Sequence, residues 1–496
     1  MLMTGDEYLN SLRDERSIYL YGERISDVTA HPAFRNSARS IARLYDALHD
    51  PAQQDALTIV DRSGIRTHRF FTASYSAPEL LAARDAMAAW ARLSYGFMGR
   101  TPDYKAAFMA TLGLNPEFYA PFDENARRWY RQYAEKGLFL NHVLVNPPVD
   151  RNRPVHEVAD VFLHVVRETD SGAVVSGAKM LATGSALTHA TFVAQNSAIN
   201  LEAGKAEDFA LVFIAPMDTP GTKLLCRPSY EQAAHSPFDH PLSSRFDEND
   251  AVLIFDEAFI PWENFLIYRN TERANAFYPA SGFFNRFNLQ AGTRLAVKLD
   301  FMTGLLAKGL ALNGTDGFRG VQAALGEVIA WRTMIWAMTT AMAMDPQPGP
   351  GGSVMPKSEY AAAMRVFGTS AWPAVKNIIE NVIGGAPIVT TSGREDLLNP
   401  DLRPLIDRYY RGTDAPAVER IKLFKLMWDA IGTEFGGRHE LYERNYAGAH
   451  EHIRVDAVNF AKRSGVLEQC EKLVDQCMAD YDLDGWVGTT WKDDRS

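Results

Sequence analysis

The chain has 496 residues, of which 46% are hydrophobic and 23% are charged, as in a soluble globular protein with two or three domains or layers. Its formal net charge of −10 argues against non-specific binding to nucleic acid or to an anionic membrane surface. The three cysteines form no CxxC motif, which favours a reducing cytoplasm. Residues 1–16 lack an apolar core, and no apolar run approaches 18 residues, so we expect neither a signal peptide nor a transmembrane span.

Residues 1–139 are predicted to form a mostly helical domain. Thr4 and Glu7 have the spacing of a capping box at the start of a helix. Helical periodicity follows at 76–99 and again at 125–140. A short extended excursion with a glycine turn is expected at 19–28.

Residues 140–275 are predicted to form a β domain. Residues 160–181 alternate and turn at Asp170-Ser171-Gly172, which indicates a hairpin. Further short β-rich runs cover 188–195, 208–217, 222–230 and 250–268. This spacing favours a small antiparallel sheet or barrel.

Residues 276–496 return to long helical patterns, so the order is α, then β, then α. The helices are expected at 287–312, 317–344, 356–385 and 416–435. A loop rich in proline and glycine, 345–356, separates the second helix from the third.

Candidate functional residues gather between 95 and 197. Arg100 and Tyr104 are four residues apart, so on a helix they would share one face. His142 lies in a proline-rich stretch, and 183–185 form a turn between two predicted strands. An Arg, a Tyr and a His suit a clamp for a phenol oxygen or another oxyanion. The plain alternative is that Arg100 pairs with Asp103 while the tyrosine and the histidine are structural.

Several long motifs in this order resemble one known family. They are YGFMGRTPDYKAAF (95–108), LNHVLVNPPVDRNRP (140–154) and SGAKMLATGSALTHATFVAQNS (176–197). GDEYLNSLRDERSIYLYGERI, GTRLAVKLDF and GTEFGGRHELYERNYAGAHEHIR extend the likeness over nearly the whole chain. The chain resembles the oxygenase component of two-component, reduced-flavin-dependent aromatic hydroxylases. This family is typified by 4-hydroxyphenylacetate 3-monooxygenase and includes chlorophenol monooxygenases and tyrosine-derivative hydroxylases of natural-product pathways.

The resemblance implies an α+β, acyl-CoA dehydrogenase-like fold. It would comprise an N-terminal helical domain (1–139), a central antiparallel β-barrel (140–275) and a C-terminal helical bundle (276–496). In that fold the flavin lies in the groove between the β domain and the bundle, and the subunits usually form a homotetramer.

The resemblance also implies a reaction. FADH2 reaches the protein by diffusion from a separate NAD(P)H:flavin reductase and reacts with O2 to give a flavin C4a-hydroperoxide. A para-substituted phenol is then hydroxylated at its ortho carbon to a catechol. A hydroxyphenylacetate, a chlorophenol, a free tyrosine derivative and an aminoacyl group tethered to a carrier protein remain open as substrates.

Site residues follow from the same resemblance. Arg100, Tyr104 and His142 would hold the phenol oxygen, with His142 able to act as a general base. Ser197 and Ala198 would meet the distal end of the substrate. Thr183 or Ser185 would lie beside N5 of the flavin ring. The expected flavin-binding residues are His142, Leu144, Pro148, Arg151, Thr183, Ser185, Arg444, Asn445 and Ala447.

Other interpretations are kept beside this one. An acyl-CoA dehydrogenase-like oxidoreductase would need a catalytic carboxylate, for which Glu434 or Glu443 is available. A flavin-binding paralogue without activity is a third interpretation. A metal site at His439, His450 and His452 is disfavoured because their spacing matches no ligand pattern. An iron–sulfur dehydratase of this superfamily is also disfavoured, because no cysteine lies near residue 100.

Overall fold

The computed structural model describes residues 1–150, 152–196 and 199–491. The predicted capping box is confirmed, since the Thr4 hydroxyl accepts from the Glu7 N–H and the Glu7 carboxylate accepts from the Thr4 N–H. The N-terminal segment is mostly helical, as predicted. Its helices are α1 (Gly5–Ser11), α2 (Arg35–Ala47), α3 (Gln54–Leu57), α4 (Ala77–Leu93), α5 (Pro102–Leu114) and α6 (Asp123–Lys136).

Helix α5 begins at Pro102, so Arg100 lies before its first residue. Thr101 is extended, with ψ at 166°, and Pro102 is the first helical residue. Proline fits the first helical turn because its missing N–H needs no partner there, and it disfavours helix in the residue before it. Tyr104 is therefore helical, whereas Arg100 lies in the loop before the helix. The expectation that both share one helical face is wrong.

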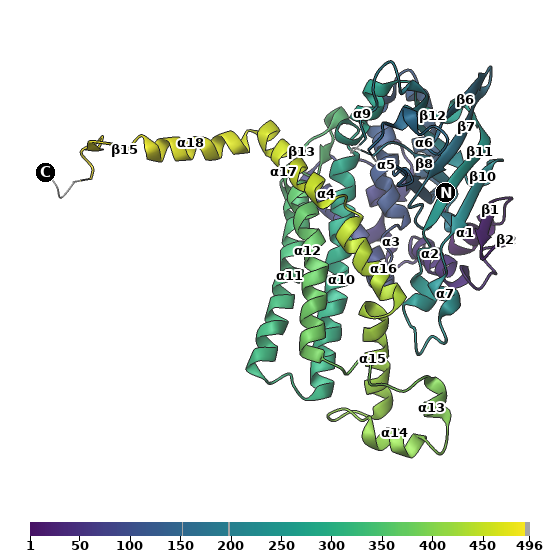
Figure 1. The fold of residues 1–496 in the computed structure, drawn as a ribbon, viewed down its shortest axis with the longest axis vertical. Helices are drawn as coiled ribbons and strands as arrows, with labels where there is room; N and C mark the ends of the chain where they lie inside the picture. Colours follow the sequence, from purple (N-terminus) through teal and green to yellow (C-terminus); the bar gives the residue numbers. More distant parts are fainter. Residues whose placement is uncertain (151, 197–198, 492–496) are drawn as a thin grey trace.

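The strands form two main sheets, which lie on one side of the molecule (Figure 1). The larger has the order β2-β1-β10-β11-β7-β6 and the smaller has the order β12-β9-β8-β5. Their bounds are β1 (Ser17–Leu20), β2 (Glu23–Ile25), β5 (Leu140–Val143), β6 (His164–Thr169), β7 (Gly172–Lys179), β8 (Ala190–Val193), β9 (Leu211–Pro216), β10 (Thr222–Cys226), β11 (Ala251–Pro261) and β12 (Phe265–Tyr268). Two-stranded pairs are β3 (Thr58–Val60) with β4 (Arg66–His68), β13 (Gln347–Pro348) with β14 (Val354–Met355), and β15 (Tyr481–Asp482) with β16 (Gly485–Trp486).

The predicted hairpins are confirmed, but the predicted antiparallel barrel is not. β6 and β7 pair antiparallel across Asp170-Ser171, and β1 and β2 pair across a turn at Tyr21-Gly22. In contrast, β1 pairs with β10 and β5 pairs with β8 in parallel. A parallel pair requires a long crossover connection, and these crossovers join strands that are distant in sequence. The two main sheets thus each mix parallel and antiparallel pairs.

The stretch 176–197 contains the two predicted strands, but they do not pair with each other. β7 lies in the larger sheet and β8 in the smaller one. Gly184 has a left-handed backbone, with φ at 71°, and the 3-10 helix η4 (Ser185–Leu187) follows it. The connection between the strands therefore passes from one sheet to the other, and Thr183 lies on this passage.

The C-terminal half is helical, as predicted, and its longest helices lie side by side (Figure 1). The predicted helix 416–435 is interrupted at Gly432, because Thr433 caps a new helix there. The helices are α9 (Thr271–Ala280), α10 (Phe283–Asn313), α11 (Arg319–Met344), α12 (Ser358–Ile383), α13 (Arg394–Leu398), α14 (Arg403–Tyr409), α15 (Ala417–Ile431), α16 (Glu434–Asn445), α17 (His450–Ser464) and α18 (Val466–Met478). Short helices α7 (Tyr230–Ala233) and α8 (Ser243–Phe246) precede them.

Helix α18 leads away from the body of the molecule (Figure 1). None of its residues is buried, and Leu473, Val474 and Met478 are each more than half exposed. No described helix is long and apolar enough to cross a membrane. The domain boundaries at 139 and 275 stay a prediction, and β1 and β2 show that the first segment also contributes strands to the larger sheet.

Candidate active site

One cavity of about 500 Å³ lies where the smaller sheet, α5, the α9–α10 region, α12 and the loop after α16 meet. This volume is in the range of small-molecule and cofactor sites. We call it the main cavity. It is lined by Arg100, Tyr104, His142, Leu144, Val145, Asn146, Pro147, Arg153, Pro154, Val155, Phe162, Met180, Leu181, Thr183, Asn196, Ile199, Asn200, Tyr278, Phe283, Phe287, Arg365, Asn445, Tyr446, Ala447, Gly448, Ala449 and His452.

Arg100 lies in the cavity wall inside a group of tyrosines. The carbon of its guanidinium lies 3.9 Å from the centre of the Tyr104 ring and 5.0 Å from that of Tyr442. Its Nη1 donates to the Tyr442 hydroxyl at 2.9 Å. Burial opposes the charge, but Tyr104 and Tyr442 offset it and keep the pKa of Arg100 above its ordinary value. The site therefore holds a permanent positive charge next to the cavity.

The backbone around Arg100 is fixed separately from its side chain. The Glu248 carboxylate accepts from the N–H groups of Gly99 and Arg100, at 2.8 and 2.5 Å. A side chain at position 99 would collide with Tyr442, because a Cβ there would lie 2.1 Å from the tyrosine hydroxyl oxygen. The glycine of the motif thus allows Tyr442 to approach and bind the guanidinium.

His142 lies on edge strand β5 and stacks near two aromatic rings. Its ring centre is 5.6 Å from that of Tyr104 and 4.8 Å from that of Phe108. Its side chain is partly exposed and lines the main cavity. Burial, reinforced by the charges of Lys105 and Arg100, holds the pKa of His142 well below its ordinary value.

Lys105 is a contact of His142 that the sequence interpretation missed. Its Nζ lies 2.9 Å from Nδ1 of His142, and the lysine is almost fully buried and does not line the main cavity. Burial, followed by the charge of Arg100, lowers the pKa of Lys105 well below its ordinary value. Its position one residue after Tyr104 in RTPDYK was the available signal.

Thr183 borders the cavity from the passage between β7 and β8. Its hydroxyl donates to Oδ1 of Asp250 at 2.7 Å. Asp250 also accepts from Arg227, Arg438 and the Tyr446 hydroxyl. Burial alone would raise the pKa of Asp250, but the two arginines hold it well below the ordinary range. Because this carboxylate is ionised and only accepts, the Thr183 oxygen is left with lone pairs to offer to a ligand.

The opposite wall is aromatic and includes the sharp turn after α16. Tyr278, Phe283 and Phe287 line it, together with Arg365 of α12. The Arg365 Nε donates to the Ala447 carbonyl at 2.5 Å. Gly448 has φ at +123°, and a Cβ there would lie 2.7 Å from the Arg365 guanidinium. A flat, apolar wall of this kind suits an aromatic ring.

The remaining predicted residues divide into three groups. Leu144, Asn445 and Ala447 line the main cavity. Pro148, Ser185 and Arg444 do not: Pro148 is exposed, Ser185 is fully buried in η4, and Arg444 pairs with Glu440 on the surface of α16. Arg151, Ser197 and Ala198 lie outside the described residues. The roles assigned to all these residues stay predictions.

An acyl-CoA dehydrogenase would need a catalytic carboxylate, and among the described residues no Asp or Glu lines the main cavity. Glu443 is buried in ion pairs with Arg294 and Lys298, the latter at 3.0 Å. Glu434 lies in the first turn of α16 and does not line the main cavity. In the described part of the chain, His439, His450 and His452 belong to no group of potential metal ligands.

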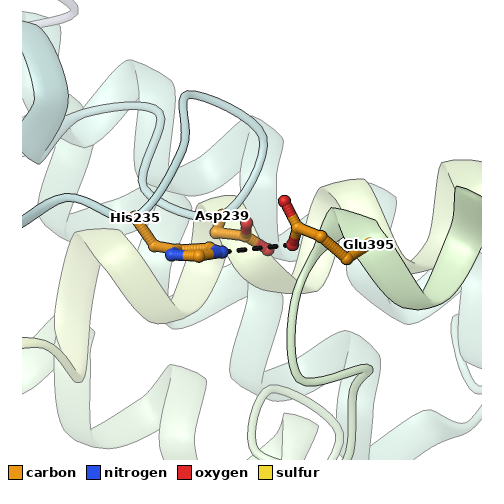
Figure 2. A group of neighbouring side chains, drawn as sticks. All are labelled: His235, Asp239 and Glu395. Atoms are coloured by element: carbon orange, nitrogen blue, oxygen red, sulfur yellow. Dashed lines mark hydrogen bonds and ion pairs between the residues drawn. The ribbon is translucent and has the colours of Figure 1, made fainter.

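A second polar group lies elsewhere, where the loop before α8 meets α13. Figure 2 shows His235, Asp239 and Glu395 pointing toward one another, with 3.1 Å between His235 Nε2 and the Glu395 carboxylate. Asp239 is already engaged, because Lys425 Nζ lies 2.8 Å from its Oδ1 and the Ser236 hydroxyl donates to its Oδ2. A lysine in this position repels a cation, so we interpret the group as a structural ion-pair cluster.

Solved structures define the class of protein to which this fold belongs. The oxygenase component (HpaB) of 4-hydroxyphenylacetate 3-monooxygenase, complexed with FAD and 4-hydroxyphenylacetate, matches with a TM-score of 0.90 and 30% identity. The match covers 96% of this chain and 99% of that one. An archaeal 4-hydroxybutyryl-CoA dehydratase from N. maritimus shares the fold, with a TM-score of 0.84 and 19% identity over the full length of both chains. The fold is thus α+β and acyl-CoA dehydrogenase-like.

Sequence comparison gives the family. The pattern described as 4-hydroxyphenylacetate 3-hydroxylase N terminal matches residues 4–267, and the C-terminal pattern matches 274–475. The chain therefore belongs to the 4-hydroxyphenylacetate 3-hydroxylase family.

Three relatives show the range of this family. The pyoverdin chromophore biosynthetic protein PvcC of Pseudomonas aeruginosa is 57% identical, over 99% of this chain and 98% of its own. A 4-hydroxyphenylacetate 3-monooxygenase oxygenase component of the same organism is 55% identical, over 98% of this chain and 94% of its own. A Streptomyces globisporus monooxygenase named for a substrate on a peptidyl-carrier protein is 51% identical, over 98% of this chain and 92% of its own.

Proposed function

We propose that this protein is the oxygenase component of a two-component aromatic hydroxylase. It uses reduced FAD and O2 to hydroxylate a para-substituted phenol at the ortho carbon, which yields a catechol. The observation that carries the proposal is the convergence of Arg100, Tyr104 and His142 on one cavity that also contains Thr183. Membership of the family supports it.

The residues of the cavity fit a flavin. The Asn146 side-chain oxygen in the wall is buried and has no hydrogen-bond partner among the described residues. An unpaired buried acceptor is costly, so it suits a ligand with N–H or O–H donors, as the flavin ring and its ribityl chain have. Thr183 offers a second acceptor. When bound in its reduced form, the flavin supplies the electrons that activate O2 for transfer of one oxygen atom.

The chain's own residues prepare the phenol. Arg100 stabilises a negative phenol oxygen, because a guanidinium keeps its charge at any physiological pH. An ionised phenol carries more electron density on its ortho carbon, which is the carbon to be oxygenated. His142 borders the same space and can exchange a proton with the phenol oxygen. Apolar side chains of the wall, such as Phe283 and Phe287, limit the contact of water with the reacting atoms.

Partners follow from this chemistry. A separate NAD(P)H:flavin reductase delivers FADH2 by diffusion. The cytoplasm is the proposed location, in keeping with three free cysteines. The substrate is a small phenol or a phenol tethered to a carrier protein. The exposed apolar side chains of α18 support a homotetramer, in which this arm packs against another copy.

The direct test combines the purified protein with FADH2 from an unrelated flavin reductase and with a panel of para-substituted phenols. We expect at least one phenol to yield a catechol, with one oxygen atom from 18O2 in the product. Tyr104→Phe should lower the yield, whereas Tyr409→Phe should not, because Tyr409 is exposed and does not line the main cavity. Reoxidation of flavin to hydrogen peroxide with every phenol, and no catechol, would reject the proposal.

A further inference from the structure

Lys105 is a buried lysine of helix α5. Among the described residues, no carboxylate lies within ion-pair distance of its Nζ, whose hydrogen-bond partner is His142. Lys298, another buried lysine beside a histidine, lies 3.1 Å from His439 Nδ1 but also has Glu443 as a counter-ion. A buried amine without a counter-ion is costly when charged.

We propose that Lys105 is the final acceptor of the substrate's phenolic proton, which reaches it through His142. This inference rests on the proposed function and names the group that completes its acid–base chemistry. The geometry behind it is a chain of contacts: the cavity, then the imidazole that lines it, then the lysine Nζ, which lies 2.9 Å from Nδ1 of His142 and outside the cavity lining.

The proton transfer is balanced within three groups. Before the phenol binds, Lys105 is a neutral amine that accepts a hydrogen bond from the Nδ1–H of His142. The lone pair of Nε2, the nitrogen that Lys105 does not contact, is then the one left to accept a proton. Nε2 takes the proton from the phenol oxygen while the Nδ1 proton passes to Lys105. The result is a phenolate, a neutral imidazole that donates from Nε2–H, and an ammonium group; no proton enters or leaves the site.

The surrounding charges favour proton transfer to Lys105 only when the phenol is bound. Arg100 repels a proton on Lys105, and Glu248, which binds the backbone before α5, attracts one. Tyr104 stacks on Arg100 and lies close to the lysine, with 5.1 Å between Nζ and the ring centre. Burial and Arg100 keep the pKa of Lys105 low in the empty cavity. A phenolate adds a negative charge nearby, which raises that pKa again.

His142 by itself would be a poorer final acceptor. An imidazolium would be buried near the positive charge of Arg100, and burial and Arg100 both hold the pKa of His142 below its ordinary value. With the relay, the imidazole ends neutral and donates a hydrogen bond to the phenolate. The positive charge then lies on Lys105 and not on the imidazole.

The test measures protons and ionisation when 4-nitrophenol binds to the FAD-loaded protein. This probe is yellow as a phenolate and nearly colourless as a phenol. Binding is measured one pH unit below the probe's own pKa, by absorbance and by calorimetry in two buffers of different ionisation enthalpy. In the wild type we expect a bound phenolate and almost no proton released to the buffer.

Two substitutions of Lys105 distinguish its role as a proton acceptor from the effect of its positive charge. In Lys105→Arg the probe should bind as a phenolate and release close to one proton per site, because arginine stabilises the anion but cannot accept a proton. In Lys105→Met the bound probe should stay a phenol. Lys298→Met is the matched buried-lysine control, since it does not line the main cavity, and its bound probe should ionise as in the wild type.

A second readout uses turnover of the phenol that gives most catechol. In Lys105→Arg, kcat/KM should rise tenfold per pH unit below the phenol's pKa, because the proton must first leave to solvent. The wild type should be nearly independent of pH over that range. Equal pH profiles and equal proton release in the wild type and Lys105→Arg would overturn the relay. Catechol formation by the wild type separates failure of the relay from failure of the proposed function.

Discussion

Replacement of Arg100 by methionine tests the electrostatic basis of the proposed site. Methionine has a similar length and keeps the backbone N–H that binds Glu248, so the loop before α5 stays anchored. The substitution removes the charge beside the cavity and the bond to the Tyr442 hydroxyl. Glu248 retains Arg438 as an ion-pair partner at 3.4 Å, so the substitution leaves its charge paired.

The expected magnitude follows from Coulomb's law. A phenolate about 4 Å from the guanidinium, at an effective dielectric constant of about 20, gains about 4 kcal/mol. Each 1.4 kcal/mol corresponds to a factor of about ten. Tyr104 and His142, which also line the cavity, offset part of the loss, so we expect kcat/KM for hydroxylation to fall by roughly 100- to 1,000-fold.

The assay compares catechol formation for a series of para-substituted phenols of graded acidity. In the wild type, Arg100 offsets the poor acidity of weakly acidic phenols. In Arg100→Met the rate should depend more steeply on phenol acidity. Arg39→Met is a control, because Arg39 is exposed on α2 and binds only a backbone carbonyl of its own helix.

Two results would refute this reasoning. One is a loss smaller than tenfold in a variant that remains folded. The other is an unchanged dependence on phenol acidity, which would mean that the phenol reacts without help from this charge. Thermal unfolding of the variant, followed by circular dichroism, establishes that the fold is intact.

Four further predictions concern the groups around the cavity and the arm. Thr183→Val should weaken binding of reduced FAD and raise the share of hydrogen peroxide among the products, whereas Thr183→Ser should behave like the wild type in both respects. An unchanged peroxide yield in the valine variant would exclude a contact between the Thr183 hydroxyl and the flavin. Tyr442→Phe should lower kcat/KM about tenfold, through loss of one hydrogen bond to a charged group, and an effect on unfolding alone would contradict this. Burial would raise the pKa of Glu443, but Arg294 and Lys298 lower it to about 2. The ionised carboxylate therefore stabilises the folded protein at pH values above its unfolded pKa of about 4.3, and this stability is lost as the pH falls toward 2. Glu443→Gln should therefore lower the free energy of unfolding at pH 7 by about 3–5 kcal/mol, and the difference in urea unfolding should shrink below pH 4.5; a pH-independent difference would count against the ion pairs. Removal of 466–496 should lower the mass measured by light scattering, and an unchanged tetramer would show that the arm is dispensable for assembly.

Local sequence patterns determined most of the helices and the hairpins. The Thr4–Glu7 capping box, the Asp170-Ser171 turn and the long C-terminal helices depend on neighbours a few residues apart, so periodicity and turn residues suffice to predict them. The motifs around Arg100, Tyr104 and His142 identified the family and pointed to the cavity. The start of α5 is also predictable from the sequence, because a proline at 102 favours the first helical position.

The tertiary structure decided what depends on contacts between distant segments. The parallel pairs β1·β10 and β5·β8 join strands about 50 to 200 residues apart, and no local pattern specifies such partners. Thr183 acquires its acceptor from Asp250, 67 residues away. Arg100 acquires Tyr442 from 342 residues away. These partners set the direction of each hydrogen bond and the charge that surrounds the cavity, because burial and electrostatic attraction depend on distance in space and not on distance along the chain.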